Sequence, residues 1–163
     1  MMLLPLTMLA LTAPSPLPAC QANQLSLGFD GENGAFDGMS QSGTLLVVRN
    51  IGGVACRMPG LPKLTLKDAQ GHALPLSRKA PRGMHPGPVI VPAGIAPGAE
   101  LTARLHWVSG PVYDHNRCYD VRYAAITLGK QSLQAPLSAH LCGEAGTSVT
   151  FDQAALHPDP RLD

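Results

Sequence analysis

The residues with the clearest capacity for chemistry are soft metal ligands. Met84 and His85 are adjacent in a segment rich in proline and glycine, and a thioether beside an imidazole suits Cu(I). The chain offers more ligands of both kinds, namely His72, His106, His115, His140, His157, Met39 and Met58. A blue-copper centre is excluded, because it needs a thiolate with His and a weak axial Met, and no nearby His and Met follow Cys142. The competing interpretation is that Met84 packs its loop onto the domain while His85 is solvated.

An acidic, glycine-rich segment suggests calcium. It runs from Asp30 to Asp37, and an EF-hand that starts at Asp30 needs Gly at position six and Glu at position twelve. The chain has Ala35 and Gln41 at these positions, so the EF-hand pattern fails. An oxygen cage of another kind stays open, beside a loop whose side chains satisfy its own turn backbone.

Hydrolytic chemistry would need a serine activated by histidine and aspartate. Ser109, Asp114 and His115 are close in the sequence, but the chain lacks the G-x-S-x-G turn that exposes such a serine. We interpret the segment YDHNRC as a loop pinned by Cys118 instead. Trp107 could anchor a ligand, yet a lone Trp on a strand usually belongs to the core. We therefore expect neither an enzyme nor a bound cofactor.

The four cysteines point to crosslinks rather than to metal or redox motifs. No pair has the C-x-x-C spacing of thioredoxin-like or zinc-ribbon proteins. An even count in an exported chain predicts two disulfides, and three connectivities are open. We favour Cys20–Cys56 with Cys118–Cys142, because each pair then closes a local loop. Such a crosslink contributes about 3–4 kcal/mol to stability.

Composition narrows the class of protein. Only 14% of the residues are charged and the net charge is +1, without the clustered Lys and Arg of a nucleic-acid surface. With three Phe, three Tyr and one Trp, the chain also lacks rings for a base-stacking platform. Its 17 Gly and 16 Pro fall between short apolar runs, where they mark turns between strands. We exclude nucleic acid as a partner.

The elements that must position any site are short strands. Alternating or continuous apolar runs predict strands at 23–29, 44–49, 63–67, 72–76, 89–91, 100–108, 121–128, 132–137 and 148–151. The run TLLVVR at 44–49 predicts a central strand buried on both faces, and Pro75 places the strand around it at a sheet edge. About nine strands separated by turn signals are typical of an all-β, immunoglobulin-like Greek-key sandwich.

The N-terminus predicts export. The first 13 residues, MMLLPLTMLALTA, are uncharged and suit the apolar region of a signal peptide, but are too short to span a bilayer. Leu17 to Cys20 also resembles a lipobox, so lipidation of Cys20 competes with its disulfide. We divide the chain into a signal peptide (1–19), a sandwich domain (20–152) and a disordered tail (153–163).

Several segments in a fixed order resemble one family. These are LLVVRNIGGVAC, PGLPKLTLKDAQGHAL, the IAPGAE turn, LHWV and the closing LCG, together with the placement of the cysteines. They are similar to the exported bacterial domain-of-unknown-function family 4232, from about residue 20 to residue 151. The resemblance implies an immunoglobulin-like sandwich in the cell envelope or outside the cell. It carries over no catalytic residues.

Together these features predict a non-enzymatic module, periplasmic or secreted, that binds an unknown envelope or extracellular partner or has a structural role. It contacts the membrane only if Cys20 is lipidated. The alternative is a periplasmic copper-binding protein with His and Met ligands. Two long loops, 30–42 and 77–88, are the expected recognition surfaces, with Met84 and His85 at the tip of the second.

Overall fold

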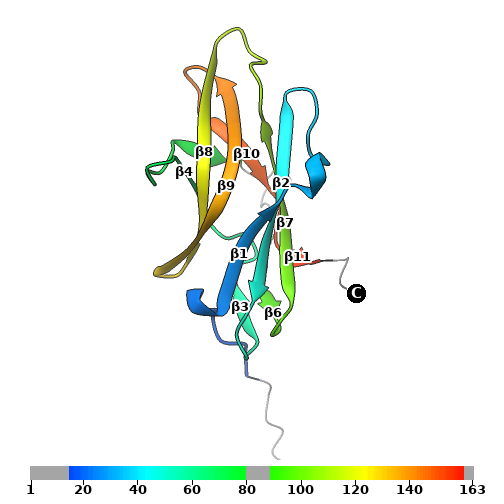
Figure 1. Ribbon diagram of the computed structural model, residues 1–163. Coiled ribbons are helices and arrows are strands. Elements are labelled where there is room, and N and C mark those ends of the chain that lie inside the picture. The colour runs from blue at the N-terminus through cyan, green and yellow to red at the C-terminus, as the bar shows by residue number, and fades with distance from the viewer. Residues whose placement is uncertain (1–14, 80–88, 160–163) are drawn as a thin grey trace, which may run out of the picture.

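The computed structural model describes residues 15–79 and 89–159 (Figure 1). The predicted leader up to residue 14, and Met84 with His85, lie outside the described residues. The strands are β1 (Leu25–Asp30), β2 (Gln41–Asn50), β3 (Cys56–Met58), β4 (Leu64–Lys67), β5 (Leu76–Arg78), β6 (Ala93–Ile95), β7 (Glu100–Val108), β8 (Asn116–Leu128), β9 (Gln131–Glu144), β10 (Val149–Gln153) and β11 (His157–Pro158). Two 3-10 turns, η1 (Ala22–Gln24) and η2 (Glu32–Gly34), are the helical elements of this part of the chain.

The strands form two packed sheets, as the all-β prediction required. One sheet has the order β1-β2-β7-β10-β5, with β11 also paired to β7, and the other has the order β4-β8-β9. A small pair, β3-β6, lies at one end. Strands β1, β7 and β10 of the first sheet contact β9 of the second, so the core lies between the two layers (Figure 1). This arrangement is compatible with an immunoglobulin-like Greek key.

Alternation along β7 shows why the sheets pack as they do. Every second residue points into the core, namely Leu101, Ala103, Leu105 and Trp107, while Arg104 is exposed on the outer face. Trp107 is therefore a core residue. The prediction that β2 is buried on both faces was wrong. Leu46 and Val48 are fully buried, but the outward Leu45 is only half-buried, because short segments rather than a full layer cover this face.

Two predicted strands are displaced. The apolar run 89–91 is exposed, and the nearby strand is β6, whose Ile95 pairs with Cys56 and is buried. Likewise, the predicted strand 72–76 is only partly paired: Ala73 forms an isolated bridge with Lys67, and Leu76, its last residue, begins β5, which pairs with β10. In both cases the position of the strand is set by the backbone of the strand that it pairs with, and apolar composition alone does not identify that strand.

The predicted disordered tail begins too early. Residues 153–159 continue the domain, because Leu156 is buried against the core and β11 pairs with β7. The amide of Leu156 donates to the carbonyl of Gly60 at 2.7 Å. Leu156 is the one large apolar residue of this segment and gave no periodic signal, which is why the sequence placed the segment outside the sandwich. Residues 160–163 lie outside the described residues.

The predicted hairpin around Gly129 is present and longer than expected. Strands β8 and β9 pair in antiparallel fashion from Asn116↔Glu144 to Leu128↔Gln131. Of the segment YDHNRC, which was predicted to be a loop pinned by Cys118, residues 113–115 form a loop, whereas Asn116 to Cys118 belong to β8. The polar, exposed side chains of this end carry a weak strand signal, and pairing with β9 overrides it.

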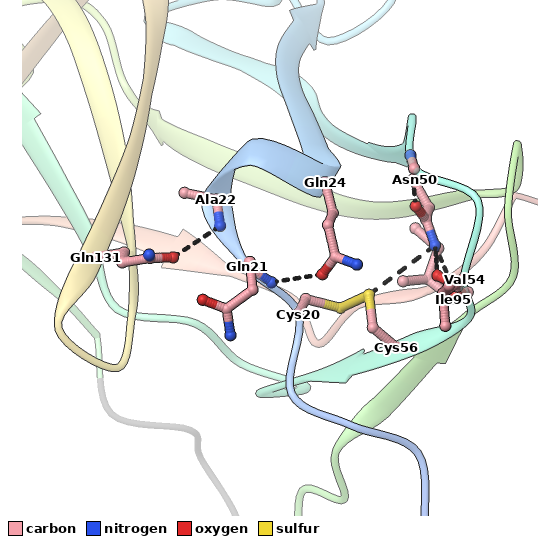
Figure 2. The surroundings of a disulfide bond; sticks show 10 residues. Cys20, Gln21, Ala22, Gln24, Asn50, Val54, Cys56, Ile95 and Gln131 are labelled. Atoms are coloured by element: carbon pink, nitrogen blue, oxygen red, sulfur yellow. Dashed lines mark hydrogen bonds between the residues drawn. A yellow bond between two sulfur atoms is a disulfide. The ribbon is translucent and has the colours of Figure 1, made fainter.

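The cysteines form Cys20–Cys56 and Cys118–Cys142, the connectivity that the sequence favoured. The first disulfide is buried and fastens the N-terminal segment to β3 (Figure 2). The buried amide of Asn50 lies beside it and donates to the carbonyl oxygens of Val54 at 2.9 Å and Ile95 at 3.1 Å. This region therefore belongs to the core.

Candidate functional site

A pocket of about 580 Å³ opens on the outer face of the first sheet. Its floor is formed by β2 and β7, one wall by the loop around η2, and the other by the C-terminal segment that carries β11. The lining includes Phe36, Leu45, Arg104 and His157. The first of the two long loops predicted to carry recognition therefore lines a pocket, together with the C-terminal segment that was predicted to be disordered.

Hydrogen bonds within the loop explain how it folds over the sheet. The Oδ1 atom of Asp30 accepts from the amide of Glu32 at 2.8 Å, and the Ser42 hydroxyl donates to Asp37 at 2.6 Å. Both aspartates of the calcium hypothesis thus satisfy groups of their own loop. A Cβ atom at Gly43 would lie 2.4 Å from the carbonyl oxygen of Leu105, so only glycine lets β2 approach β7 this closely.

Arg104 is a cation in the lining of the pocket. Its guanidinium lies 5.8 Å from the centroid of the Phe36 ring, a cation–π contact. In the part of the chain that the structure describes, no carboxylate lies within 4.0 Å of this guanidinium. Glu32 and Asp159 also line the pocket, and each takes part in an interaction. The guanidinium of Arg104 presents planar donors of the kind that bind a carboxylate through two hydrogen bonds.

A second pocket, of about 300 Å³, lies on the other side of the same loop. It is lined by Asp37, Ser42, Trp107 and Ser138 among others. The indole nitrogen of Trp107 is buried and has no hydrogen-bond partner within residues 15–79 and 89–159. A buried Trp nitrogen usually donates a hydrogen bond to an acceptor. The loop therefore borders two pockets, one lined by Arg104 and the other by Trp107.

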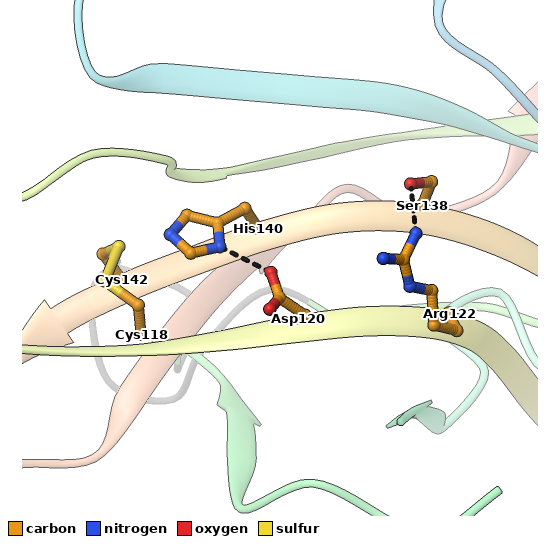
Figure 3. A network of polar contacts seen from close by, with 6 residues as sticks. All are labelled: Cys118, Asp120, Arg122, Ser138, His140 and Cys142. Carbon is orange, nitrogen blue, oxygen red and sulfur yellow. Dashed lines mark hydrogen bonds and ion pairs between the residues drawn. A yellow bond between two sulfur atoms is a disulfide. The ribbon is translucent and has the colours of Figure 1, made fainter. Parts of the chain in front are cut away.

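A different arrangement of polar groups lies on the outer face of the second sheet. Three rungs connect β8 and β9: the Cys118–Cys142 disulfide, a contact between Asp120 and His140, and the side chains of Arg122 and Ser138 at 3.4 Å (Figure 3). The His140 Nδ1 atom lies 2.7 Å from Oδ1 of Asp120. The hydrogen bond from His140 lowers the pKa of Asp120 below 3.8, and the charges of His140 and Arg122 add to this.

Three side chains of the first two rungs could together bind a metal ion. One ligand atom from each of Cys118, His140 and Cys142 lies within 4.8 Å of the other two. Sequence reasoning named His140 as a possible ligand but missed this cluster, because it considered only residues that follow Cys142 and took the cysteines as oxidised. The signal was present as Cys-x-Asp on one strand and His-x-Cys on the next, which places each pair on one face of its strand.

The remaining candidates lie apart from one another. No hydrogen bond between described residues joins the side chains of Ser109, Asp114 and His115. The His115 carbonyl accepts from Ala145, and the Ser109 amide donates to Ser40. Of the other candidate ligands, His106 shares the carboxylate of Asp152 with Lys79, which precedes residues 80–88, and Met58 lines a pocket together with Ile90 and Pro92, which follow them.

The fold and its crosslinks define a class: an all-β sandwich with two disulfides, as is typical of an oxidising, extracytoplasmic environment. Residues 20–158 match the family described as Domain of unknown function (DUF4232), and the chain belongs to that family. Neither a curated protein nor a solved structure matches the chain. Among the helices described, none is long and apolar enough to cross a membrane.

Proposed function

We propose that this protein is an exported, non-enzymatic binding module whose ligand occupies the pocket beside Arg104. The observation that carries the proposal is a cation on an outer sheet face, stacked on Phe36 and without a carboxylate partner among the described residues. A structural module has no need to place an arginine in this way. The volume also falls within the ~300–1,000 Å³ range usual for small-molecule sites.

The chemistry of the lining indicates the ligand class. An anionic group would accept from the guanidinium, while Phe36 and Leu45 offer apolar surface to the rest of the molecule. We therefore propose a small carboxylate with an apolar body. The lining presents no histidine hydrogen-bonded to a nucleophile, since the Nδ1 atom of His157 contacts the carbonyl of Pro158. This supports binding rather than catalysis.

Export rests on a second line of argument. The uncharged leader resembles a signal peptide, and both cysteine pairs are oxidised, which supports maturation in an oxidising compartment. Because the Cys20 sulfur is bonded to Cys56, the folded domain has no thiol at Cys20 to acylate. We propose that the mature protein is periplasmic or secreted and not anchored through Cys20. Copper binding through Met84 and His85 stays a prediction of the sequence.

Phenylacetate, with the neutral phenylacetamide as its control, tests the site. Titration followed by NMR should shift the amides of Phe36, Leu45 and Arg104 with phenylacetate only. Arg104→Gln should weaken this binding by about tenfold or more, because a charged hydrogen bond is lost. Arg117→Gln, a matched change at an exposed arginine of the second sheet, should leave it unchanged. Failure of phenylacetate to bind, or binding that Arg104→Gln does not weaken, would contradict the proposal.

A further inference from the structure

The Cys118–Cys142 disulfide joins two strands that are already held together. Its cysteines face each other in the β8–β9 ladder, and backbone pairing continues along both strands to the turn at Gly129. Breaking the sulfur–sulfur bond therefore leaves the two side chains opposite each other. The same is not true of Cys20–Cys56, where one cysteine lies on a segment fastened by a single bridge of backbone hydrogen bonds.

A reductant can reach this disulfide. Cys118 is exposed, whereas Cys142 is buried, so an incoming thiolate would attack the Cys118 sulfur and release the Cys142 thiolate. Both cysteines of the other disulfide are buried, with exposed fractions of 6% for Cys20 and 0% for Cys56. The two crosslinks are therefore distinguishable by a soluble dithiol.

His140 is held in the form that a metal ligand requires. Its Nδ1 atom lies 2.7 Å from the Asp120 carboxylate, and a carboxylate can only accept this hydrogen bond when ionised. In the neutral ring, the proton is then on Nδ1 and the Nε2 lone pair is free. Figure 3 shows the second ring nitrogen on the side of the ring that faces the disulfide. A carboxylate behind a histidine is the usual support for a metal-binding imidazole.

We propose that reduction of Cys118–Cys142 creates a zinc site formed by the two thiolates and the Nε2 atom of His140. Tetrahedral zinc with Zn–S bonds of about 2.3 Å needs sulfurs roughly 3.8 Å apart. Ligand atoms that lie within 4.8 Å of one another can meet this geometry by side-chain rotation alone. Three protein ligands leave a fourth position for water. This site is independent of the carboxylate pocket on the other sheet.

The redox step balances with a dithiol as reductant. A dithiol of the thiol–disulfide exchange class gives two electrons and two protons to the disulfide. It becomes a disulfide itself and leaves two thiols on this protein. Binding of Zn²⁺ then displaces the two thiol protons. In the reverse direction, a disulfide of the same exchange class takes two electrons from the two thiolates and two protons from solvent. It becomes a dithiol, the Cys118–Cys142 bond forms again and Zn²⁺ is released, so the redox state of one crosslink controls metal binding.

The test uses the folded, full-length mature protein. Mild dithiothreitol, followed by alkylation and peptide mapping, should label Cys118 and Cys142 while Cys20 and Cys56 stay paired. The selectively reduced protein, freed of reductant under anaerobic conditions, is then titrated with Zn²⁺ against a chromophoric chelator and with Co²⁺ by absorption. We expect one Zn²⁺ per reduced chain, a thiolate-to-cobalt band, and no such binding to the oxidised protein.

Variants identify the ligands. His140→Gln should weaken zinc binding by about 100-fold or more, and Asp120→Asn by about 10- to 100-fold, the effect of losing a supporting carboxylate. His106→Gln is the matched control, since His106 is also partly exposed and lies 3.7 Å from a carboxylate, that of Asp152. Absence of zinc binding, unfolding on reduction, prior reduction of Cys20–Cys56, or equal affinity in His140→Gln would each overturn the proposal.

Discussion

Cys20–Cys56 and Cys118–Cys142 close chain segments of similar length, with sequence separations of 36 and 24 residues. Loop-closure entropy alone assigns them about 4 and about 3.5 kcal/mol. Their surroundings in the folded protein differ far more. The first is buried beside the amide of Asn50, and the second lies on an outer sheet face beside His140 and Asp120 (Figures 2 and 3).

This difference shows that a disulfide's role depends on what else holds its cysteines. At Cys20 the crosslink fastens a segment that has little pairing of its own. At Cys118 the sheet provides the fastening, so the bond adds little order to the native state and its sulfurs can take part in chemistry. The same element is thus structural in one region and chemically accessible in the other.

The largest expected effect separates the two pairs by stability. Cys20→Ala/Cys56→Ala should lower the free energy of unfolding by about 5 kcal/mol, because lost core packing adds to lost loop closure. Cys118→Ala/Cys142→Ala should cost about 3.5 kcal/mol, close to the loop-closure value alone, since only one of its cysteines is buried. Urea unfolding monitored by circular dichroism measures both. Equal losses, or the reverse order, would show that the surroundings do not matter as argued.

A smaller effect compares the polar neighbours of the two disulfides. Asn50→Ala should cost about 2–3 kcal/mol, because it leaves the buried carbonyl oxygens of Val54 and Ile95 without their donor. Ser138→Ala, on the exposed ladder, should change stability by less than about 0.5 kcal/mol. The same urea experiment gives both values. A large loss in Ser138→Ala would mean that the ladder is part of what holds the sheet together.

The sequence predicted those parts of the fold that depend on local pattern. Alternation identified β7, and the turn at Gly129 identified the hairpin. The local connectivity of the cysteines followed from their order along the chain. In contrast, β6 and the docking of Leu156 depend on partners that are distant in sequence, and composition carries no information about those partners.

The candidate sites were less predictable for the same reason. The loop that lines the pocket was singled out by its length, but Arg104 and His157 joined it only through sheet packing. The ladder depends on register: a shift of one residue between β8 and β9 would move His140 away from Asp120. Spacing within one strand indicates which side chains share a face of the sheet. Only the pairing with the next strand shows which side chains of that strand lie beside them.

The smallest expected effect concerns pH. The hydrogen bond from His140 holds the pKa of Asp120 below 3.8, the ordinary carboxyl value. Because the folded-state pKa is the lower one, the contact stabilises the protein above pH 3.8 and is lost as the pH falls through the folded pKa. An NMR titration of the Asp120 carboxyl carbon should therefore have its midpoint below 3.8 in the wild-type protein.

In His140→Gln the midpoint of the Asp120 titration should rise toward the ordinary value, with Arg122 left as the remaining nearby charge. His106→Gln, on the other sheet, should leave it in place. An unchanged midpoint in His140→Gln would mean that the contact with His140 is not what lowers the pKa of Asp120.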